Sequence, residues 1–77
     1  MKVQYDEVAD ALYVTLSDDA WAYTRKLDDT RNIDYSIKGE PIGVEWLCVT
    51  SGIDLSGVPQ ADAIGKLLHE KSFKVYA

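Results

Sequence analysis

Residues 33–49, IDYSIKGEPIGVEWLCV, decide the fold of this chain. On both sides of the Lys38-Gly39 pair, apolar residues alternate with polar or small ones: Ile33, Tyr35 and Ile37 before it, and Ile42, Val44, Trp46 and Cys48 after it. A period of two that is interrupted at a glycine is typical of a β-hairpin whose strands each have one apolar face. The segment therefore predicts two antiparallel strands joined by a tight turn.

The same alternation predicts which residues of the hairpin face one another. With a two-residue loop at the Lys-Gly pair, Tyr35 lies opposite Ile42 and Ile33 lies opposite Val44. All four side chains then share one face of the sheet, as a single buried face requires. A three-residue loop would break this pattern by placing Ile33 opposite a glutamate.

Pro41 begins the second run and indicates where that run lies in the sheet. In the predicted register it pairs with Ser36, and its ring nitrogen has no hydrogen to donate. Within sheets, proline is found mainly on edge strands, where no neighbour needs that donor. The run that contains Pro41 and Trp46 is therefore predicted to be an edge strand.

Three further segments alternate in the same way, at residues 2–6, 11–17 and 21–27. Acidic breaks separate them, where aspartates such as Asp6 can accept bonds from the N–H groups that follow. Five short strands joined by short loops predict an antiparallel β-meander. Arg25 interrupts the apolar side of the third strand, and its head is expected to reach water at the sheet margin. The apolar face of the sheet comprises Val3, Tyr5, Leu12, Val14, Leu16, Trp21, Tyr23, Ile33, Tyr35, Ile42, Val44 and Trp46.

The C-terminal third supplies a cover for this apolar face. Pro59 suits the first position of a helix, and apolar residues then recur at helical spacing at Ala61, Ile64, Leu67 and Leu68. A helix packed on the apolar face is therefore predicted over about residues 59–71, and Gly65 weakens it unless close packing on the sheet makes use of the glycine. The pattern leaves open whether residues 72–77 add a further strand.

Length, composition and charge limit the class of protein. With 77 residues, of which 47% are hydrophobic and 27% charged, the chain is expected to form one α+β domain with a modest core. The net charge of −5 argues against nucleic-acid binding, which needs a basic face. The single Cys48 allows no intrachain disulfide, and no apolar run is long enough to span a membrane. The predicted location is therefore the cytoplasm.

The acidic residues fall at the two ends of the predicted sheet, because the turns of a meander alternate between its ends. Asp18, Asp19 and Glu40 lie at one end, and the other end gathers Asp6, Glu7, Asp10, Asp28 and Asp29. Strand lengths separate the two ends by about 20 Å, so the whole set cannot form one metal site. We interpret these residues as turn formers. The alternative is that the five-carboxylate rim holds a hard cation loosely or meets a basic partner.

No arrangement of side chains predicts catalysis. Cys48 and His69 are the only conceivable nucleophile and base, and nothing in their spacing brings them together. Cys48 is expected in the core, and His69 as an exposed residue or a cation at the helix end. Glu45 is expected to bond to Asn32 across the hairpin. The sequence therefore predicts no catalytic residue, no metal site and no cofactor.

Three stretches of the sequence form a recognisable pattern. Residues 5–16, YDEVADALYVTL, combine tyrosine-aspartate, a short acidic turn and alanine-aspartate-alanine-leucine-tyrosine, and residues 32–35 and 43–47, NIDY and GVEWL, follow. On these residues the chain resembles the DUF2283 family of small bacterial and archaeal proteins of unknown function. Trp46 stands where an aliphatic residue is usual, and the tail after Ser51 departs from the shortest members. The resemblance implies a bacterial or archaeal cytoplasmic protein, assigns no functional residue, and for some members suggests partnership with small toxin-like proteins.

A small core and an aromatic edge strand indicate a function in protein association. We expect a non-enzymatic cytoplasmic protein that acts as a homodimer, as the acidic partner of a basic protein such as a small toxin, or as both. The predicted interface residues are Trp46, Pro41, Asp28 and Asp29. The alternative is a small-molecule or cation binding module, or a minor enzyme, that uses the acidic rim.

Overall fold

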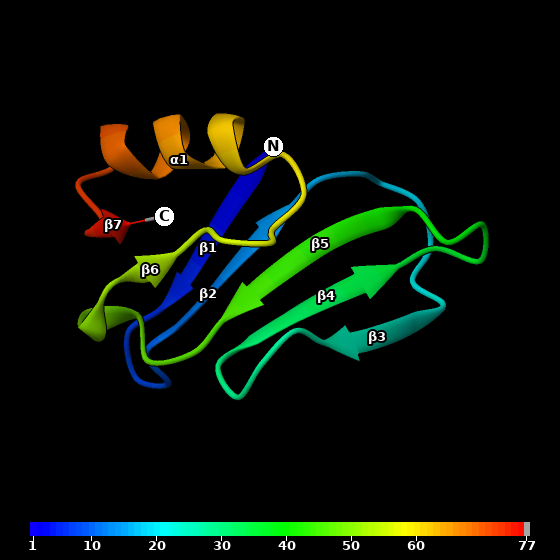
Figure 1. Ribbon diagram of the computed structural model, residues 1–77, viewed down its shortest axis with the longest axis horizontal. Coiled ribbons are helices and arrows are strands. Elements are labelled where there is room, and N and C mark those ends of the chain that lie inside the picture. The colour runs from blue at the N-terminus through cyan, green and yellow to red at the C-terminus, as the bar shows by residue number, and fades with distance from the viewer. Residues whose placement is uncertain (77) are drawn as a thin grey trace.

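Five antiparallel strands form the main sheet of this protein. The computed structural model describes residues 1–76. The strands are β1 (Lys2–Asp6), β2 (Ala11–Thr15), β3 (Tyr23–Lys26), β4 (Arg31–Tyr35) and β5 (Pro41–Trp46). Their order across the sheet is β1-β2-β5-β4-β3 (Figure 1). The predicted class, an α+β fold with a five-stranded antiparallel sheet and one C-terminal helix, is confirmed.

The strand order places β5 at the centre of the sheet. Val44 of β5 faces Ile33 of β4 on one side and Val14 of β2 on the other. The prediction that this run is an edge strand is therefore wrong, and the edge strands are β1 and β3. Pro41 is tolerated because it is the first residue of β5 and the ladder between β2 and β5 extends only to Gly43.

The hairpin register follows the prediction in the strands and departs from it near the turn. Ile33 faces Val44 as predicted, whereas Tyr35 faces Pro41 instead of Ile42. The register shifts beside Tyr35, as happens where a β-bulge adds one residue to a strand.

The turn of this hairpin is also longer than the predicted Lys-Gly pair. Ser36 N–H donates to the Glu40 carbonyl at 2.9 Å, and Gly39 N–H donates to the Ser36 carbonyl at 2.9 Å. Gly39 has a φ of 80°, a value that glycine adopts at little cost. The loop therefore spans residues 36–40, which accounts for the changed pairing of Pro41.

A C-terminal unit follows the sheet. It consists of the short 3-10 helix η1 (Val49–Ser51), β6 (Ile53–Asp54), α1 (Ala61–Glu70) and β7 (Val75–Tyr76). β6 and β7 pair in parallel, so residues 75–76 do form a strand, and residue 77 lies outside the described residues. The helix begins after Gln60, which has a left-handed φ of 55°, so Pro59 precedes α1 instead of starting it. Within residues 1–76, no helix is long and apolar enough to cross a membrane.

The core lies between the sheet and this C-terminal unit. Ile64 and Leu68 of α1 are fully buried, and a Cβ built on Gly65 would lie 2.9 Å from Leu55 Cδ1, so the close approach at this glycine is to the segment after β6 and not to the main sheet. The buried hydrophobic residues are Leu12, Val14, Ile33, Ile42, Val44, Trp46, Val49, Ile53, Val58, Ile64 and Leu68.

Three predicted members of the apolar face lie outside this core. Trp21 is 62% exposed, Tyr23 41% and Tyr5 39%. The C-terminal unit lies mainly at the β1–β2 side of the sheet, and none of the described helices and strands lies over β3 (Figure 1). The cover is therefore smaller than the sheet, which leaves Tyr23 in contact with solvent. The prediction that Trp21 shares the apolar face is wrong, because its bond to Thr24 holds it on the opposite face.

Candidate functional site

The carboxylates of the first hairpin turn are held by the protein itself. Asp6 Oδ1 accepts the N–H groups two and three residues further on, at 3.0 and 3.2 Å, as predicted. Asp10 accepts the Thr50 hydroxyl at 2.8 Å, the Thr50 N–H at 3.1 Å and the Tyr5 hydroxyl at 3.0 Å. The bonds from Thr50, and to a lesser extent that from Tyr5, hold the pKa of Asp10 below its ordinary value. These carboxylates therefore fasten a turn.

Arg31 is buried at the same end of the sheet and forms an ion pair with Asp28. Its Nε and Nη2 donate to Asp28 Oδ2 at 2.9 and 2.7 Å, and Nη1 donates to the backbone carbonyls of Asp54, at 3.1 Å, and of Ser56. The bonds from Arg31 hold the pKa of Asp28 below its ordinary value. Asp28 is thus the counter-ion of a buried arginine, while Asp29 is fully exposed, 3.5 Å from Lys26 Nζ.

A pocket of about 290 Å³ lies beside Arg31. Its lining includes Thr30, Cys48 and Ser51. Cys48 is exposed and has a left-handed φ of 54°, so the prediction that it belongs to the core is wrong. Val49 takes the buried position instead, because the chain changes direction at Cys48 as it enters η1. Among residues 1–76, no three His, Cys, Asp or Glu side chains group as metal ligands would.

The uncovered face of the sheet carries an ordered chain of hydrogen bonds. The Tyr13 hydroxyl donates to Asp34 Oδ2 at 2.7 Å, and the Thr24 hydroxyl donates to Asp34 Oδ1. Trp21 Nε1 donates to Thr24 Oγ1 at 2.9 Å. Burial, followed by the bond to Asp34, raises the pKa of Tyr13 well above its ordinary value, so the phenol remains a donor. This chain runs from β2 to β3 and fixes the position of the exposed Trp21.

Gly43 makes room for Tyr13 on this face. A Cβ at Gly43 would lie 1.8 Å from Tyr13 Oη, so the phenol ring lies directly over the glycine. Beside it, Asn32 Nδ2 donates to Glu45 Oε1 at 3.1 Å, which confirms the predicted bond of Glu45. The polar side chains at the centre of this face are thus hydrogen-bonded to one another.

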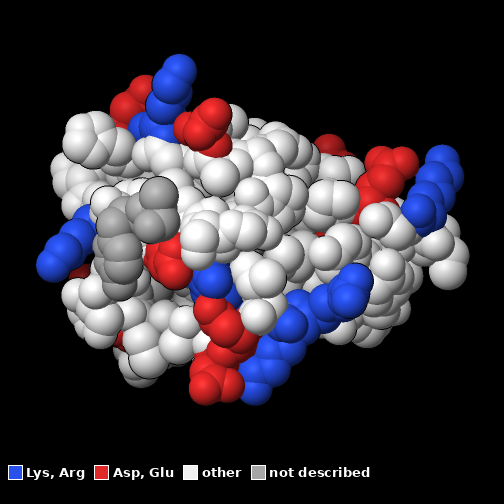
Figure 2. All heavy atoms as spheres, viewed as in Figure 1, with Lys and Arg blue, Asp and Glu red and all other residues white. Residues whose placement is uncertain are grey.

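The outer side of β3 is the candidate site. We call the surface formed by Trp21, Tyr23, Thr24, Arg25 and Lys26 the β3 edge. All four residues of β3 are exposed, and no described strand pairs with its outer side. Figure 2 shows Lys and Arg side chains along the position of β3, so this edge is locally basic on an acidic protein.

Backbone geometry shows which groups of β3 are available to a partner. Leu27 N–H donates to the Arg31 carbonyl at 2.8 Å, which makes Leu27 a residue that bonds toward β4. Residues of an antiparallel strand bond alternately to one side and the other. The N–H and C=O groups of Thr24 and Lys26 therefore point away from β4.

Aromatic side chains flank these groups on both faces of the sheet. The Tyr23 ring stacks on Tyr35 of β4, with ring centroids 5.1 Å apart and planes at 13°. Trp21 is held on the opposite face by its bond to Thr24. Tyr35 pairs with Tyr23 in the ladder, but its carbonyl accepts the N–H of Ala22. The backbone is therefore irregular where β3 begins.

The interface residues predicted from the sequence are not brought together at an edge. Trp46 is 2% exposed, and its Nε1 donates to the Asp54 carbonyl at 2.9 Å, so it cannot present its ring to a partner. Pro41 lies on the central strand. Asp28 and Asp29 remain at the sheet end, with Asp28 bound to Arg31.

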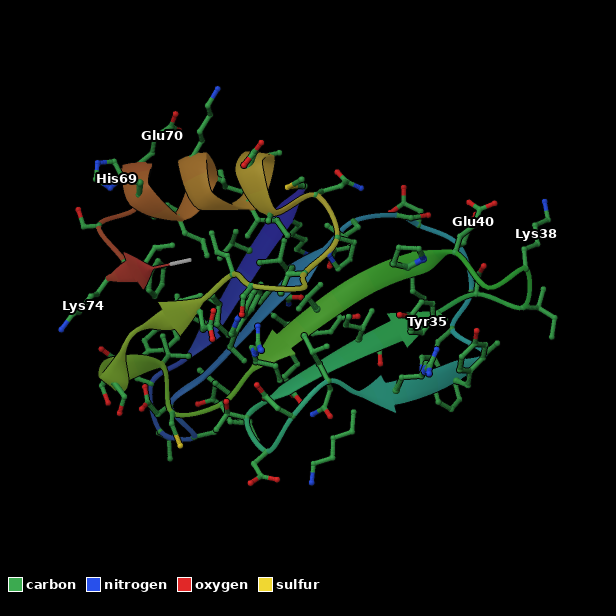
Figure 3. All side chains as sticks on the ribbon, in the orientation of Figure 1. Tyr35, Lys38, Glu40, His69, Glu70 and Lys74 are labelled. Atoms are coloured by element: carbon green, nitrogen blue, oxygen red, sulfur yellow. The ribbon has the colours of Figure 1, made fainter. Side chains whose placement is uncertain are left out.

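Two predictions about exposed residues agree with the structure. Arg25 lies at the sheet margin and is exposed, as expected from its interruption of the apolar side. His69 is exposed in the last turn of α1 and points away from the sheet (Figure 3). The missed sequence signal for the candidate site was the run Trp21–Lys26, in which an aromatic residue precedes a short strand that carries one aromatic and two basic residues, as suits an edge strand.

The match of residues 2–49 to a family model decides where this chain belongs; the model is described as a protein of unknown function, DUF2283. The chain belongs to the DUF2283 family. No curated protein and no solved structure matches it.

The matched region of this DUF2283 protein contains all five strands of the main sheet, while β6, α1 and β7 lie beyond it. The residues that carry the resemblance have structural roles here. Tyr5, Asp6 and Asp10 fasten the first turn, and Tyr13 packs over Gly43.

Proposed function

We propose that this DUF2283 protein functions by associating with other protein chains, first of all as a homodimer, through strand addition at the β3 edge. The observation that carries the proposal is the outer side of β3, where the backbone groups of Thr24 and Lys26 point away from β4 between exposed aromatic side chains. Unpaired strand edges of this kind accept a further strand, because the backbone bonds supply affinity and neighbouring side chains supply specificity.

The other edge strand, β1, offers a weaker site. Tyr5 packs edge-on against Phe73, with ring centroids 5.4 Å apart and planes at 78°, and Val3 packs against the core. The C-terminal unit thus covers the apolar side chains of β1. At β3 the Tyr23 ring stacks on Tyr35 of the neighbouring strand instead of on the C-terminal unit, which supports β3 as the edge that a partner uses.

Three carboxylates of the sheet end and of β6 are held by hydrogen bonds within the protein. A general acid needs a pKa raised toward the working pH, whereas the pKa values of Asp10, Asp28 and Asp54 are lowered by the hydrogen bonds they accept. These groups are ionised and committed to turns and to Arg31. Their arrangement supports a structural role.

The homodimer is tested by light scattering on a size-exclusion column with a matched pair of variants. Lys26→Pro removes an N–H that points away from β4, so it should leave the fold intact and convert the dimer to a monomer. Lys26→Ala removes the same side chain and keeps the N–H, so it should remain dimeric. A monomeric wild-type protein at micromolar concentration, or a Lys26→Pro variant that stays dimeric, would contradict the proposal.

The net charge of −5 supports a second version of the proposal, in which the protein is the acidic partner of a basic one. Contacts between exposed charges are screened by salt, so such binding should weaken steeply as the ionic strength rises. A fluorescent lysine-rich peptide titrated with the protein at low and at high salt tests this version. An affinity that does not change with salt, or no binding at low salt, would rule out this second version of the proposal.

A further inference from the structure

We infer that the partner of β3 is β3 of a second copy of this chain, paired antiparallel with Thr24 on the two-fold axis. The inference rests on the proposed function and adds the register of the dimer. In that register Tyr23 of each copy faces Arg25 of the other, and the main sheets of the two copies join into one.

The alternation of side chains limits the registers that two identical strands can adopt. Residues directly opposite in an antiparallel pair point to the same face of the sheet. Tyr23 and Arg25 share one face of β3, and Thr24 and Lys26 share the other. A symmetric pair must therefore place one residue on the axis, opposite itself. Among the four residues of β3, only Thr24 or Arg25 on the axis pairs most of the strand with its copy.

Charge decides between these two registers. An axis through Arg25 places two guanidinium groups directly opposite each other, which is unfavourable. An axis through Thr24 places no two like charges directly opposite. It brings each Arg25 head to the exposed Tyr23 ring of the other copy, a cation–π arrangement that arginine commonly adopts. A second copy therefore accommodates Arg25, whose charge makes pairing with other strands unfavourable.

Backbone groups fit the same register. With Thr24 on the axis, its outward N–H and C=O bond to those of the second Thr24, as a hydrogen-bonded pair requires. The outward N–H of Lys26 faces the carbonyl of Ala22 of the other copy. Ala22 N–H is bonded to the Tyr35 carbonyl of its own chain, so this pair contributes the single bond from Lys26 N–H and not the reciprocal one to the Lys26 carbonyl. The helix α1 and strand β7 lie at the opposite side of the sheet (Figure 1), and the segment after β6 approaches Leu27, beyond the end of β3, at Gly57.

Cysteine crosslinking tests the register. All variants carry Cys48→Ser, because Cys48 is exposed and would crosslink by itself. Tyr23→Cys and Arg25→Cys are oxidised separately and as an equal mixture. The mixture should form the disulfide-linked dimer, and each such dimer keeps one native contact of Tyr23 with Arg25. Thr24→Cys, oxidised alone, should also form a linked dimer.

Arg25→Cys alone is the decisive comparison. With Thr24 on the axis, the two copies of residue 25 are about 8 Å apart between Cα atoms, beyond the reach of a disulfide, so linking should be at least about ten times slower than in the mixture. Rapid linking of Arg25→Cys alone, with no linked heterodimer of Tyr23→Cys and Arg25→Cys detected by mass spectrometry in the mixture, would overturn this inference. The proposed function would survive that result if Lys26→Pro still abolished the dimer, whereas a monomeric wild-type protein would remove both.

Discussion

The contact of Tyr13 with Gly43 shows how one residue of the sheet depends on another strand. Gly43 is buried although it lies on the face without a helical cover, because the phenol ring lies over it. The Tyr13 hydroxyl continues this contact to Asp34 on β4. A glycine at this position therefore reflects the packing of a neighbouring strand.

Gly43→Ala should destabilise the protein by about 1–3 kcal/mol, because the new Cβ would overlap Tyr13 Oη and force the ring to move. Urea unfolding measures the change in the free energy of unfolding. The same substitution in a Tyr13→Ala background should cost less than about 0.5 kcal/mol, since the overlap is gone. An equal cost in both backgrounds would show that Tyr13 does not lie over Gly43.

Asp28 should make stability depend on pH. Its pKa in the folded protein lies below the unfolded value of about 3.9, so the carboxylate stabilises the fold above that pH. This contribution is lost as the pH falls through the folded-state pKa. Asp28→Asn should therefore be less stable than the wild type at pH 7, and the difference should shrink as the pH is lowered below about 4.

Asp29→Asn is the matched control for this prediction. Its side chain is fully exposed one residue further along the same turn, so the substitution should change stability little at any pH. The measurement is urea unfolding of the three proteins between neutral and acid pH. A difference between wild type and Asp28→Asn that stays constant across that range would contradict the assigned role of the Arg31 ion pair.

Residue patterns predicted the local hydrogen bonds better than they predicted the exposure of single side chains. The bonds accepted by Asp6 and Glu45 and the margin position of Arg25 follow from neighbours in the chain or across one hairpin. Trp21 is exposed because its bond to Thr24 holds it on the uncovered face, and Cys48 is exposed because the chain makes a left-handed turn there. Alternation encodes neither feature.

At the scale of elements, Gly65 has two opposite effects on stability: it weakens the helix α1, and it allows the helix to approach Leu55 closely. Gly65→Ala should raise helix stability by about 1 kcal/mol, while its Cβ would approach Leu55 Cδ1 at 2.9 Å. That atom is the end of a flexible, half-buried side chain and can move. The expected net result is a stabilisation of about 0.5 kcal/mol in thermal or urea unfolding.

Gly65→Val serves as the control, because a β-branched residue adds bulk at the same contact and forms helices less readily. It should be less stable than Gly65→Ala. A loss of more than about 1 kcal/mol in Gly65→Ala would show that the backbone of α1 must stay close to Leu55 for the fold to hold.

The alternation of apolar residues predicted the strands and their local pairing, but it did not predict that β5 lies at the centre of the sheet. The β4–β5 hairpin is local, and its pairing of Ile33 with Val44 was predicted. The pairing of β2 with β5 joins residues some thirty positions apart, for instance Val14 with Val44, and no turn signal specifies it. Pro41 misled the interpretation, because proline is also acceptable at the first residue of a strand. Gly43 was the usable signal, since a glycine there leaves room for a ring.

For the whole molecule, the uneven cover of the sheet is the feature on which the functional proposal depends. The C-terminal unit protects the β1–β2 side, and β3 remains open with aromatic and basic side chains. Net charge alone suggested a basic partner at the acidic end. The structure shows that several of those carboxylates bind the protein's own backbone, Thr50 or Arg31.

Amide hydrogen exchange at Thr24 and Lys26, followed by NMR at micromolar and millimolar protein concentration, tests this proposal most directly. Their N–H groups point away from β4, so only a partner strand can protect them. The account predicts that both amides exchange more slowly as the concentration rises, while outward amides of β1 do not change. Exchange at Thr24 and Lys26 that is fast at every concentration would contradict it.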